Sequence, residues 1–367
     1  MEFLQSYYTD IGIKRKNNQD SLALIKARTA DGDVLLAMVC DGMGGYKFGE
    51  YASKLCIESF VSWFRKELPG YLYAEGGMSR VLPDWKRIIK NVNAQLCGFG
   101  KQQNISLGTT LTAFLFYGGN YYAAQVGDSR GYQLLHRLTK LTQDQSVVGR
   151  EVEAGMLTEQ EARSDKRRNI LLESIGVTDS VNPEFYQGKI EPGATYLLCS
   201  DGFWHAPSDE ELLRYFDSSQ IHDNRTFRMH INYMIEQIKQ RGEKDNITAV
   251  GVIPMEQTEG PGEPCSTAKD RHSRVKNGTA DEKRRGSAAE AAKTQTAKAQ
   301  TAKAQMVKNQ TVKIQTAKTQ TAKTQTAKAG GVPDDEVTVP ILADAGDNPF
   351  NIVLNVICTH ADDIANR

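Results

Sequence analysis

The chain has 367 residues, of which 40% are hydrophobic and 25% are charged, a composition typical of a soluble globular protein. No apolar run approaches the roughly 20 residues of a membrane-spanning helix, and six cysteines without a CxxC pair argue against a disulfide scaffold or a zinc-thiolate site. The net charge of zero conceals an asymmetry, because residues 266–331 hold 15 Lys and Arg against 4 Asp and Glu, whereas residues 332–367 hold 1 against 7.

The first half of the chain predicts strands followed by long helices. Its N-terminus, MEFLQSYYTDIG, lacks the basic, apolar and small-residue regions of a signal peptide, so we expect a cytoplasmic protein. Apolar residues at helical spacing predict amphipathic helices over residues 52–64 and 82–99. Two apolar runs at 111–117 and 121–126, separated by Gly-Gly-Asn, predict a β-hairpin.

The second half adds shorter helices and a closing strand. The spacing of capping boxes predicts two short helices, at Thr158 with Glu161 and at Ser208 with Glu211. A third long helix is predicted over residues 225–241 and a strand over 247–253. Because strands come in runs rather than in regular βαβ alternation, we expect antiparallel sheets with helices packed outside them.

The folded domain is predicted to cover residues 1–255. Residues 256–331 form a basic linker in which a unit (Ala/Val)-Lys-x-Gln-Thr repeats seven times over 292–326. Too few large apolar groups are present to offset the entropy of ordering, so we expect disorder. The alternative is a cationic tether for nucleic acid or an anionic surface. Residues 332–367 form an acidic segment of unassigned role, whose apolar stretch 337–360 suits a small hairpin or a docking segment.

Four aspartates lie at the ends of predicted strands. Asp41, Asp128 and Asp201 each stand beside a glycine where a strand ends, and Asp245 precedes a strand. In antiparallel sheets the end of one strand lies beside the start of its neighbour, so these carboxylates can converge on one edge. Oxygen ligands without His or Cys favour Mg²⁺ or Mn²⁺. Any one Asp-Gly pair taken alone is typical of a simple turn.

The motifs follow a particular order along the chain. They are Arg15-x-x-Asn18-Gln19-Asp20-Ser21, Val39-Cys40-Asp41-Gly42-Met43-Gly44-Gly45, Gly108-Thr109-Thr110-Leu111, Val126-Gly127-Asp128-Ser129-Arg130, Leu141-Thr142-x-Asp144-x-Ser146, Ser200-Asp201-Gly202 and Asp245-Asn246-Ile247-Thr248. Over residues 6–253 this ordered set resembles the metal-dependent protein serine/threonine phosphatases of the type 2C (PPM) family, in its compact bacterial form. The resemblance implies an α+β fold, a four-layer α-β-β-α sandwich of two antiparallel sheets flanked by helix pairs.

The resemblance also implies a dinuclear centre of Mn²⁺ or Mg²⁺ in a channel at one edge of the sandwich. Asp41 matches the carboxylate that bridges both metals, and Gly42 the backbone carbonyl ligand beside it. Asp201 and Asp245 match ligands of the first metal. Asp128, together with Asp201, matches the site of a third, weaker metal in bacterial relatives.

Other positions match or depart from the family's site. Asp20 matches the residue that holds metal-bound waters, and Arg15 the arginine that binds the substrate phosphate through its planar fork of donors. Gln19 replaces a Glu found in many members, which weakens the expected affinity at the second metal. Met43 replaces a His that the animal-type branch uses to protonate the leaving group, so we expect a metal-bound water in that role. Of the six histidines, only His205 stays a candidate.

The predicted function is hydrolysis of phosphoserine and phosphothreonine in proteins by a metal-activated water, without a covalent phosphoenzyme. No CxxxxxR phosphatase loop and no GxxxxGK P-loop is present. The expected partners are phosphorylated substrates of a Ser/Thr kinase, with no membrane insertion, and the expected state is a monomer. Two alternatives stay open, a catalytically silent binding module of the same fold and an enzyme for a small phosphorylated metabolite.

Residues 145–183 fall where the family carries a mobile flap beside the active site. Lys166, Arg167 and Arg168 in this segment would attract acidic or phosphorylated substrates. The plainer interpretation is a solvated pair of helices.

Overall fold

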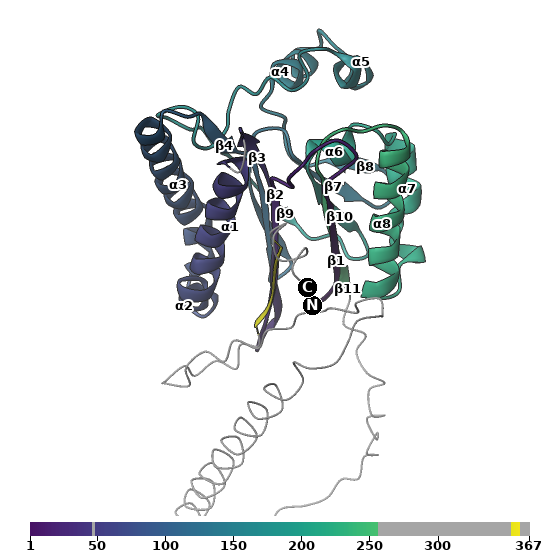
Figure 1. The fold of residues 1–367 in the computed structure, drawn as a ribbon. Coiled ribbons are helices and arrows are strands. Elements are labelled where there is room, and N and C mark those ends of the chain that lie inside the picture. The colour runs from purple at the N-terminus through teal and green to yellow at the C-terminus, as the bar shows by residue number, and fades with distance from the viewer. Residues whose placement is uncertain (46–47, 256–353, 360–367) are drawn as a thin grey trace, which may run out of the picture. The chain divides into compact units, whose positions relative to one another are not determined.

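The computed structural model describes residues 1–45, 48–255 and 354–359, and in these residues the strands form two sheets (Figure 1). The five-stranded sheet has the order β1 (Glu2–Asp10), β11 (Ile247–Met255), β10 (Thr195–Cys199), β7 (Arg130–Leu134) and β8 (Leu138–Lys140). The other follows the order β12 (Leu354–Thr359), β2 (Asp20–Thr29), β3 (Gly32–Gly44), β5 (Leu111–Tyr117), β6 (Asn120–Val126) and β9 (Glu184–Lys189), with β4 (Leu107–Thr109) paired to β3. All these pairings are antiparallel.

Helices cover the outer face of each sheet, which gives four layers (Figure 1). α1 (Phe48–Lys66) and α3 (Val81–Gln103) lie on the larger sheet, and α7 (Asp209–Tyr215) and α8 (Asn224–Gln240) lie on the other. The shorter helices are α2 (Leu68–Leu72), η1 (Gly77–Arg80), α4 (Val147–Glu153), α5 (Glu159–Ser164), α6 (Asp201–Trp204) and η2 (Ser218–Gln220). The predicted α-β-β-α sandwich is confirmed.

The alternation of side chains along the strands explains the layers. In β2, Leu22 and Leu24 belong to the core between the two sheets, whereas Ala23 and Ile25 belong to the core under α1 and α3. Successive side chains of a strand point to opposite faces, so a strand that is apolar on both faces is stable only between two layers. A third core, around Phe227 of α8, fills the space between the five-stranded sheet and its helices.

The helices predicted from apolar spacing are confirmed as α1, α3 and α8. Both capping boxes are present, with Thr158 and Ser208 accepting hydrogen bonds from the backbone of Glu161 and Glu211. The predicted hairpin is β5 with β6, in the register Leu111↔Val126.

The C-terminal segment contributes one strand to the larger sheet. β12 pairs with β2 from Leu354↔Ala27 to Thr359↔Leu22, and it belongs to the same compact unit as the two sheets. The predicted linker 256–331 and its repeats 292–326 lie outside the described residues. The domain boundary near residue 255 therefore stays a prediction, while part of the acidic segment now has a place beside β2.

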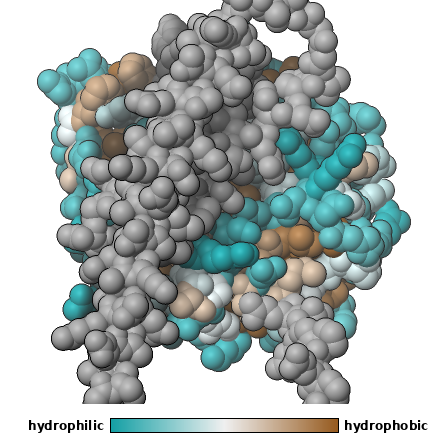
Figure 2. Space-filling view, turned by 90° about the horizontal axis from the view of Figure 1, so that it is seen from below, coloured by the Kyte–Doolittle hydropathy of each residue, from teal (hydrophilic) through white to brown (hydrophobic). Residues whose placement is uncertain are grey.

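The exterior is mixed in character. In Figure 2, which views the molecule from below, the coloured part of the surface combines hydrophilic side chains with small apolar areas. Among the helices of the described residues, none is both long enough and apolar enough to cross a membrane.

Candidate metal centre

The pairing of β2 with β3 brings two of the predicted carboxylates together. Its register places Asp20, the first residue of β2, directly opposite Asp41 near the end of β3. The backbone of Asp41 is held on both sides, because its N–H donates to Thr110 Oγ1 (2.9 Å) and its carbonyl accepts from Thr110 N (2.9 Å) and Thr109 Oγ1 (3.0 Å). Asp41 therefore occupies a fixed position at the end of the sandwich.

The five-stranded sheet supplies two more carboxylates to the same end. Asp201 opens α6 just after β10, and Asp245 precedes β11, the neighbour of β10. A Cβ on Gly202 would lie 2.1 Å from the carbonyl oxygen of Asn246, so only glycine lets these segments approach so closely. The charge of Asp201 raises the pKa of Asp41, so the two carboxylates lie close to one another across the two sheets.

Gly42 is required by close packing of the backbone. A Cβ at this position would lie 2.1 Å from the carbonyl oxygen of Gly49 at the start of α1. The N–H of Gly42 donates to the carbonyl of Gln19 at 3.2 Å, which fixes the direction of the chain beside Asp41. The use of its carbonyl as a metal ligand stays a prediction.

Asp128 lies in the turn between β6 and β7 and is buried. Its backbone carbonyl accepts a hydrogen bond from Trp204 Nε1 (3.0 Å), and this tryptophan also packs over the guanidinium of Arg130, 3.4 Å from the ring centre. Burial and then the charge of Asp201 raise the pKa of Asp128 well above its usual value. The fourth predicted aspartate therefore borders the same cluster.

The carboxylates of the cluster resist ionisation in the absence of a cation. Burial, together with the charges of neighbouring aspartates, raises the pKa of Asp20 to about 7 and that of Asp201 to about 6. Burial, followed by the charges of Asp20 and Asp201, raises the pKa of Asp41 well above its usual value. Such upward shifts are expected where several carboxylates share a site of low polarity.

Two buried carboxylate oxygens, Asp20 Oδ1 and Asp201 Oδ1, have no hydrogen-bond partner within the described part of the chain. Buried polar atoms are nearly always paired, so these oxygens suit an ion. The all-oxygen donor set, with its excess of negative charge, fits a hard divalent cation such as Mg²⁺ or Mn²⁺.

In this conformation, however, the predicted ligands do not yet form a complete metal site. Among the residues that the structure describes, no three acidic, His or Cys side chains are arranged so that they could hold an ion as they stand. Asp245 is engaged elsewhere, because its Oδ2 accepts a hydrogen bond from Arg15 Nη2 at 2.5 Å. Asp245 would have to release Arg15 to complete the set.

Asn246 is a residue of the site whose role the sequence analysis missed. Its side-chain amide donates to the carbonyls of Ile11 (2.9 Å) and Asn17 (3.1 Å), and its Oδ1 accepts from the N–H of Gln19 (2.9 Å). These three bonds fasten the β1–β2 loop, which carries Arg15, to the start of β11. An Asn beside a candidate ligand is a weak signal, because the residue type alone does not reveal which backbone groups it reaches.

Ser200 supports the cluster in a similar way. Its hydroxyl donates to Asp20 Oδ2 at 2.9 Å and accepts from the N–H of Thr248 at 3.1 Å. Asp20 is thereby oriented from the opposite sheet.

His205 lies at the edge of the cluster but does not suit proton donation near neutral pH. Its Nδ1 is 3.8 Å from Glu243 Oε2 and 4.0 Å from Asp201 Oδ2. Burial, followed by the charge of Arg168, lowers its pKa to about 4, so the imidazole is neutral at pH 7.

The comparisons with known proteins agree with this architecture. Residues 13–249 match the family model for protein phosphatase 2C. The serine/threonine phosphatase stp of Listeria monocytogenes is 30% identical over 248 residues, which are 66% of this chain and 93% of that protein. A solved serine/threonine phosphatase of S. agalactiae has a TM-score of 0.59 and 30% identity, over 69% of this chain and 99% of that one.

A structure of the catalytic domain of the serine/threonine protein phosphatase PstP was solved in complex with two manganese ions. It has a TM-score of 0.56 and 28% identity, over 69% of this chain and 99% of that one. The two antiparallel sheets flanked by helices form a fold of the phosphatase 2C type. The chain belongs to the protein phosphatase 2C family.

Proposed function

We propose that this chain is an active, metal-dependent protein serine/threonine phosphatase that hydrolyses phosphoserine and phosphothreonine. The observation that carries the proposal is the cluster of Asp20, Asp41, Asp128 and Asp201, whose carboxylates have raised pKa values and include two buried oxygens without a hydrogen-bond partner among the described residues. The names of the relatives support the substrate class. A catalytically silent module is disfavoured, because loss of these ligands would be its expected signature.

The chain's own residues would divide the work as follows. Asp41, Asp201 and Asp245, with the carbonyl of Gly42, would hold two ions, and Asp128 would help to hold a third. When bound, the ions would lower the pKa of the attacking water and neutralise the phosphoryl oxygens. No covalent phosphoenzyme is then needed.

Two further residues would position the reactants. Asp20, oriented by Ser200 and placed opposite Asp41, would orient the attacking water. Arg15 lies beside Asp245 at the edge of the candidate site, with half of its side chain exposed. Its guanidinium offers a planar fork of donors that matches phosphate oxygens.

Phosphate release in Mn²⁺ from a phosphothreonine peptide, a phosphotyrosine peptide and a sugar phosphate would test the proposal. We expect rapid release from the first alone. Preferential release from the sugar phosphate would favour the metabolite enzyme, and no release from any substrate would favour the silent module.

Arg15→Ala is expected to raise KM about 10- to 100-fold, because hydrogen bonds between charged partners contribute roughly 1.5–3 kcal/mol. A phosphate clamp outside the metal pair holds the ground state and the transition state alike, so kcat should fall less. Arg15→Lys should restore only part of the affinity, since an ammonium group cannot form the bidentate fork.

Steady-state kinetics on one phosphothreonine peptide would measure both parameters. Unchanged kinetics in the alanine variant would mean that Arg15 serves only to pair with Asp245.

A further inference from the structure

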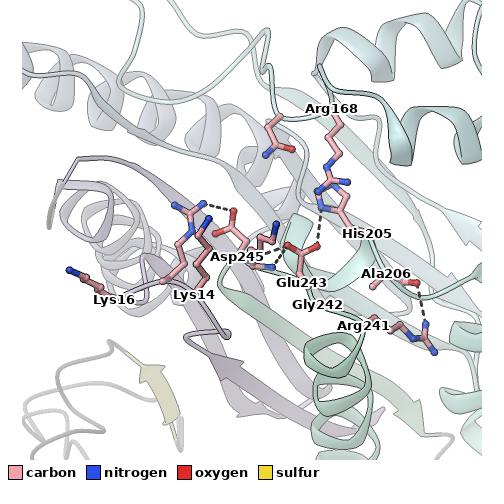
Figure 3. A pocket seen from close by; sticks show the side chains of 12 residues that line it. Lys14, Lys16, Arg168, His205, Ala206, Arg241, Gly242, Glu243 and Asp245 are labelled. Atoms are coloured by element: carbon pink, nitrogen blue, oxygen red, sulfur yellow. Dashed lines mark hydrogen bonds and ion pairs between the residues drawn. The ribbon is translucent and has the colours of Figure 1, made fainter.

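A pocket of about 720 Å³ opens beside the carboxylate cluster. Its walls come from the β1–β2 loop, from residues 168–169 after α5, from residues 205–206 after α6 and from residues 241–245 before β11. In Figure 3, Lys14 and Lys16 lie to one side of Asp245, and Arg168 lies next to His205. The pocket therefore lies between the β1–β2 loop, which carries Arg15, and the end of the 145–183 segment.

Six of the residues that line the pocket are basic, and two of these are neutralised by carboxylates. Arg15 is paired with Asp245, and Arg241 donates to both carboxylate oxygens of Glu211, at 2.6 and 2.8 Å. The other acidic residue of the pocket, Glu243, accepts hydrogen bonds from the backbone N–H groups of its own loop.

The remaining four cations have no carboxylate partner within the described ranges of the chain. Lys14, Lys16 and Lys244 are exposed at the pocket and make no ion pair with any residue that the structure describes. Arg168 donates to the carbonyl of Arg163 at 3.0 Å and forms no ion pair with a carboxylate of the described residues. A concave surface with one sign of charge concentrates ligands of the opposite sign.

Three neighbouring basic residues of the 145–183 segment, Lys166, Arg167 and Arg168, differ in their contacts. Arg167 is bound to Asp165 and Glu151 through four side-chain hydrogen bonds and does not line the pocket. Lys166 is not part of the pocket wall. Arg168 alone of the three lines the pocket, and its charge acts to lower the pKa of Asp201.

We propose that this pocket binds a second anionic group of the substrate, a carboxylate or a phosphate that flanks the phosphorylated residue. The inference rests on the proposed phosphatase function and adds the substrate class, which is acidic or doubly phosphorylated segments. An extended peptide advances about 3.4 Å per residue, so a side chain two or three residues from the phosphorylated residue would reach a pocket that borders Asp245.

The test uses four labelled phosphothreonine peptides of equal length that differ only in the flanking positions, which hold Ala, Asp, a second phosphothreonine or Lys. Binding to the full chain is measured by fluorescence anisotropy, and turnover is measured by phosphate release in Mn²⁺. We expect the Asp and doubly phosphorylated peptides to bind about tenfold more tightly than the Ala peptide, as two or three partly exposed charge pairs allow. The Lys peptide should bind most weakly.

High salt and charge-reversing substitutions then show whether the preference for anionic peptides arises from this pocket. The preference should vanish at 1 M salt, where the Debye length is about 3 Å. The double variant Lys14→Glu with Lys244→Glu should remove or reverse the preference, while Lys86→Glu, which changes an exposed lysine on α3, should keep it. A further peptide with two flanking Asp residues has about the charge of a second phosphate. If it binds as tightly as the doubly phosphorylated peptide, the site accepts any anion, whereas tighter binding of the doubly phosphorylated peptide would indicate a phosphate site.

The outcomes separate this inference from the proposed function. Equal binding of the Ala and Asp peptides, or a preference that survives the double variant, would overturn the anion pocket even if all peptides are dephosphorylated. A clear binding preference without phosphate release from any peptide would support the pocket and overturn the phosphatase function.

Discussion

Asp41→Asn is expected to reduce kcat on a phosphothreonine peptide about a thousandfold, because the metal ions contribute several kcal/mol of transition-state stabilisation. The fold should survive the change. Burial and four neighbouring aspartates disfavour the charge at this position, so the metal-free variant should be at least as stable as the metal-free parent. Thermal unfolding in EDTA and steady-state kinetics in Mn²⁺ would measure the two effects separately.

Asp33 provides a matched control for this substitution. It is a buried aspartate on the same strand, but it pairs with Lys26 (3.4 Å) and Arg28 (3.2 Å) at the far end of β2 and β3. Asp33→Asn should lower stability, since it breaks a partly buried ion-pair network, and should leave kcat unchanged. An Asp41→Asn protein that unfolds would assign Asp41 a structural role instead.

Removal of divalent metal is expected to abolish activity and to lower the melting temperature. The pKa values of Asp20 (about 7) and Asp201 (about 6) are raised in the folded state. Between about pH 4 and 7 the metal-free folded state therefore binds more protons than the unfolded state. The metal-free protein therefore loses stability as pH rises from about 4 through 7. A bound cation offsets the same repulsion, so the stabilisation by Mn²⁺ should be larger at pH 8 than at pH 5.5.

Melting curves at both pH values, with Mn²⁺ or with EDTA, would test this linkage. In EDTA, Asp41→Asn should show a weaker dependence on pH than the parent, because one charge of the cluster is missing. Full activity after exhaustive chelation would rule out a metal enzyme. A melting temperature of the metal-free protein that does not change with pH would contradict the repulsion between carboxylates.

Much of the fold and of the site was predictable because the signals are local. Apolar periodicity predicts α1, α3 and α8, since each buries one face against a sheet. Asp201 stands at the end of one strand and Asp245 at the start of another, which predicts that they lie close together, because antiparallel pairing brings such ends to one edge, as in β10 and β11.

The rest depends on contacts between distant segments, which no local pattern encodes. The Arg15–Asp245 pair joins residues 230 positions apart, and the bonds of Asn246 reach backbone groups of a loop that lacks periodicity. Arg167 and Arg168 are neighbours of the same type, yet one pairs with carboxylates and the other lines the pocket. In an irregular segment, the direction of each side chain follows from the backbone angles and not from the composition.

The pairing of β12 with β2 changes the topology of the basic part of the chain. Residues 256–353 connect β11 to β12, two strands of the same compact unit, so in chain order they are an insertion between two strands and not a C-terminal tail. If this connection lacks fixed structure, as the sequence predicts, halving or doubling its length changes the free energy of closing it by only about 0.6 kcal/mol. The number of pentapeptide repeats can therefore change during evolution with almost no effect on the catalytic unit.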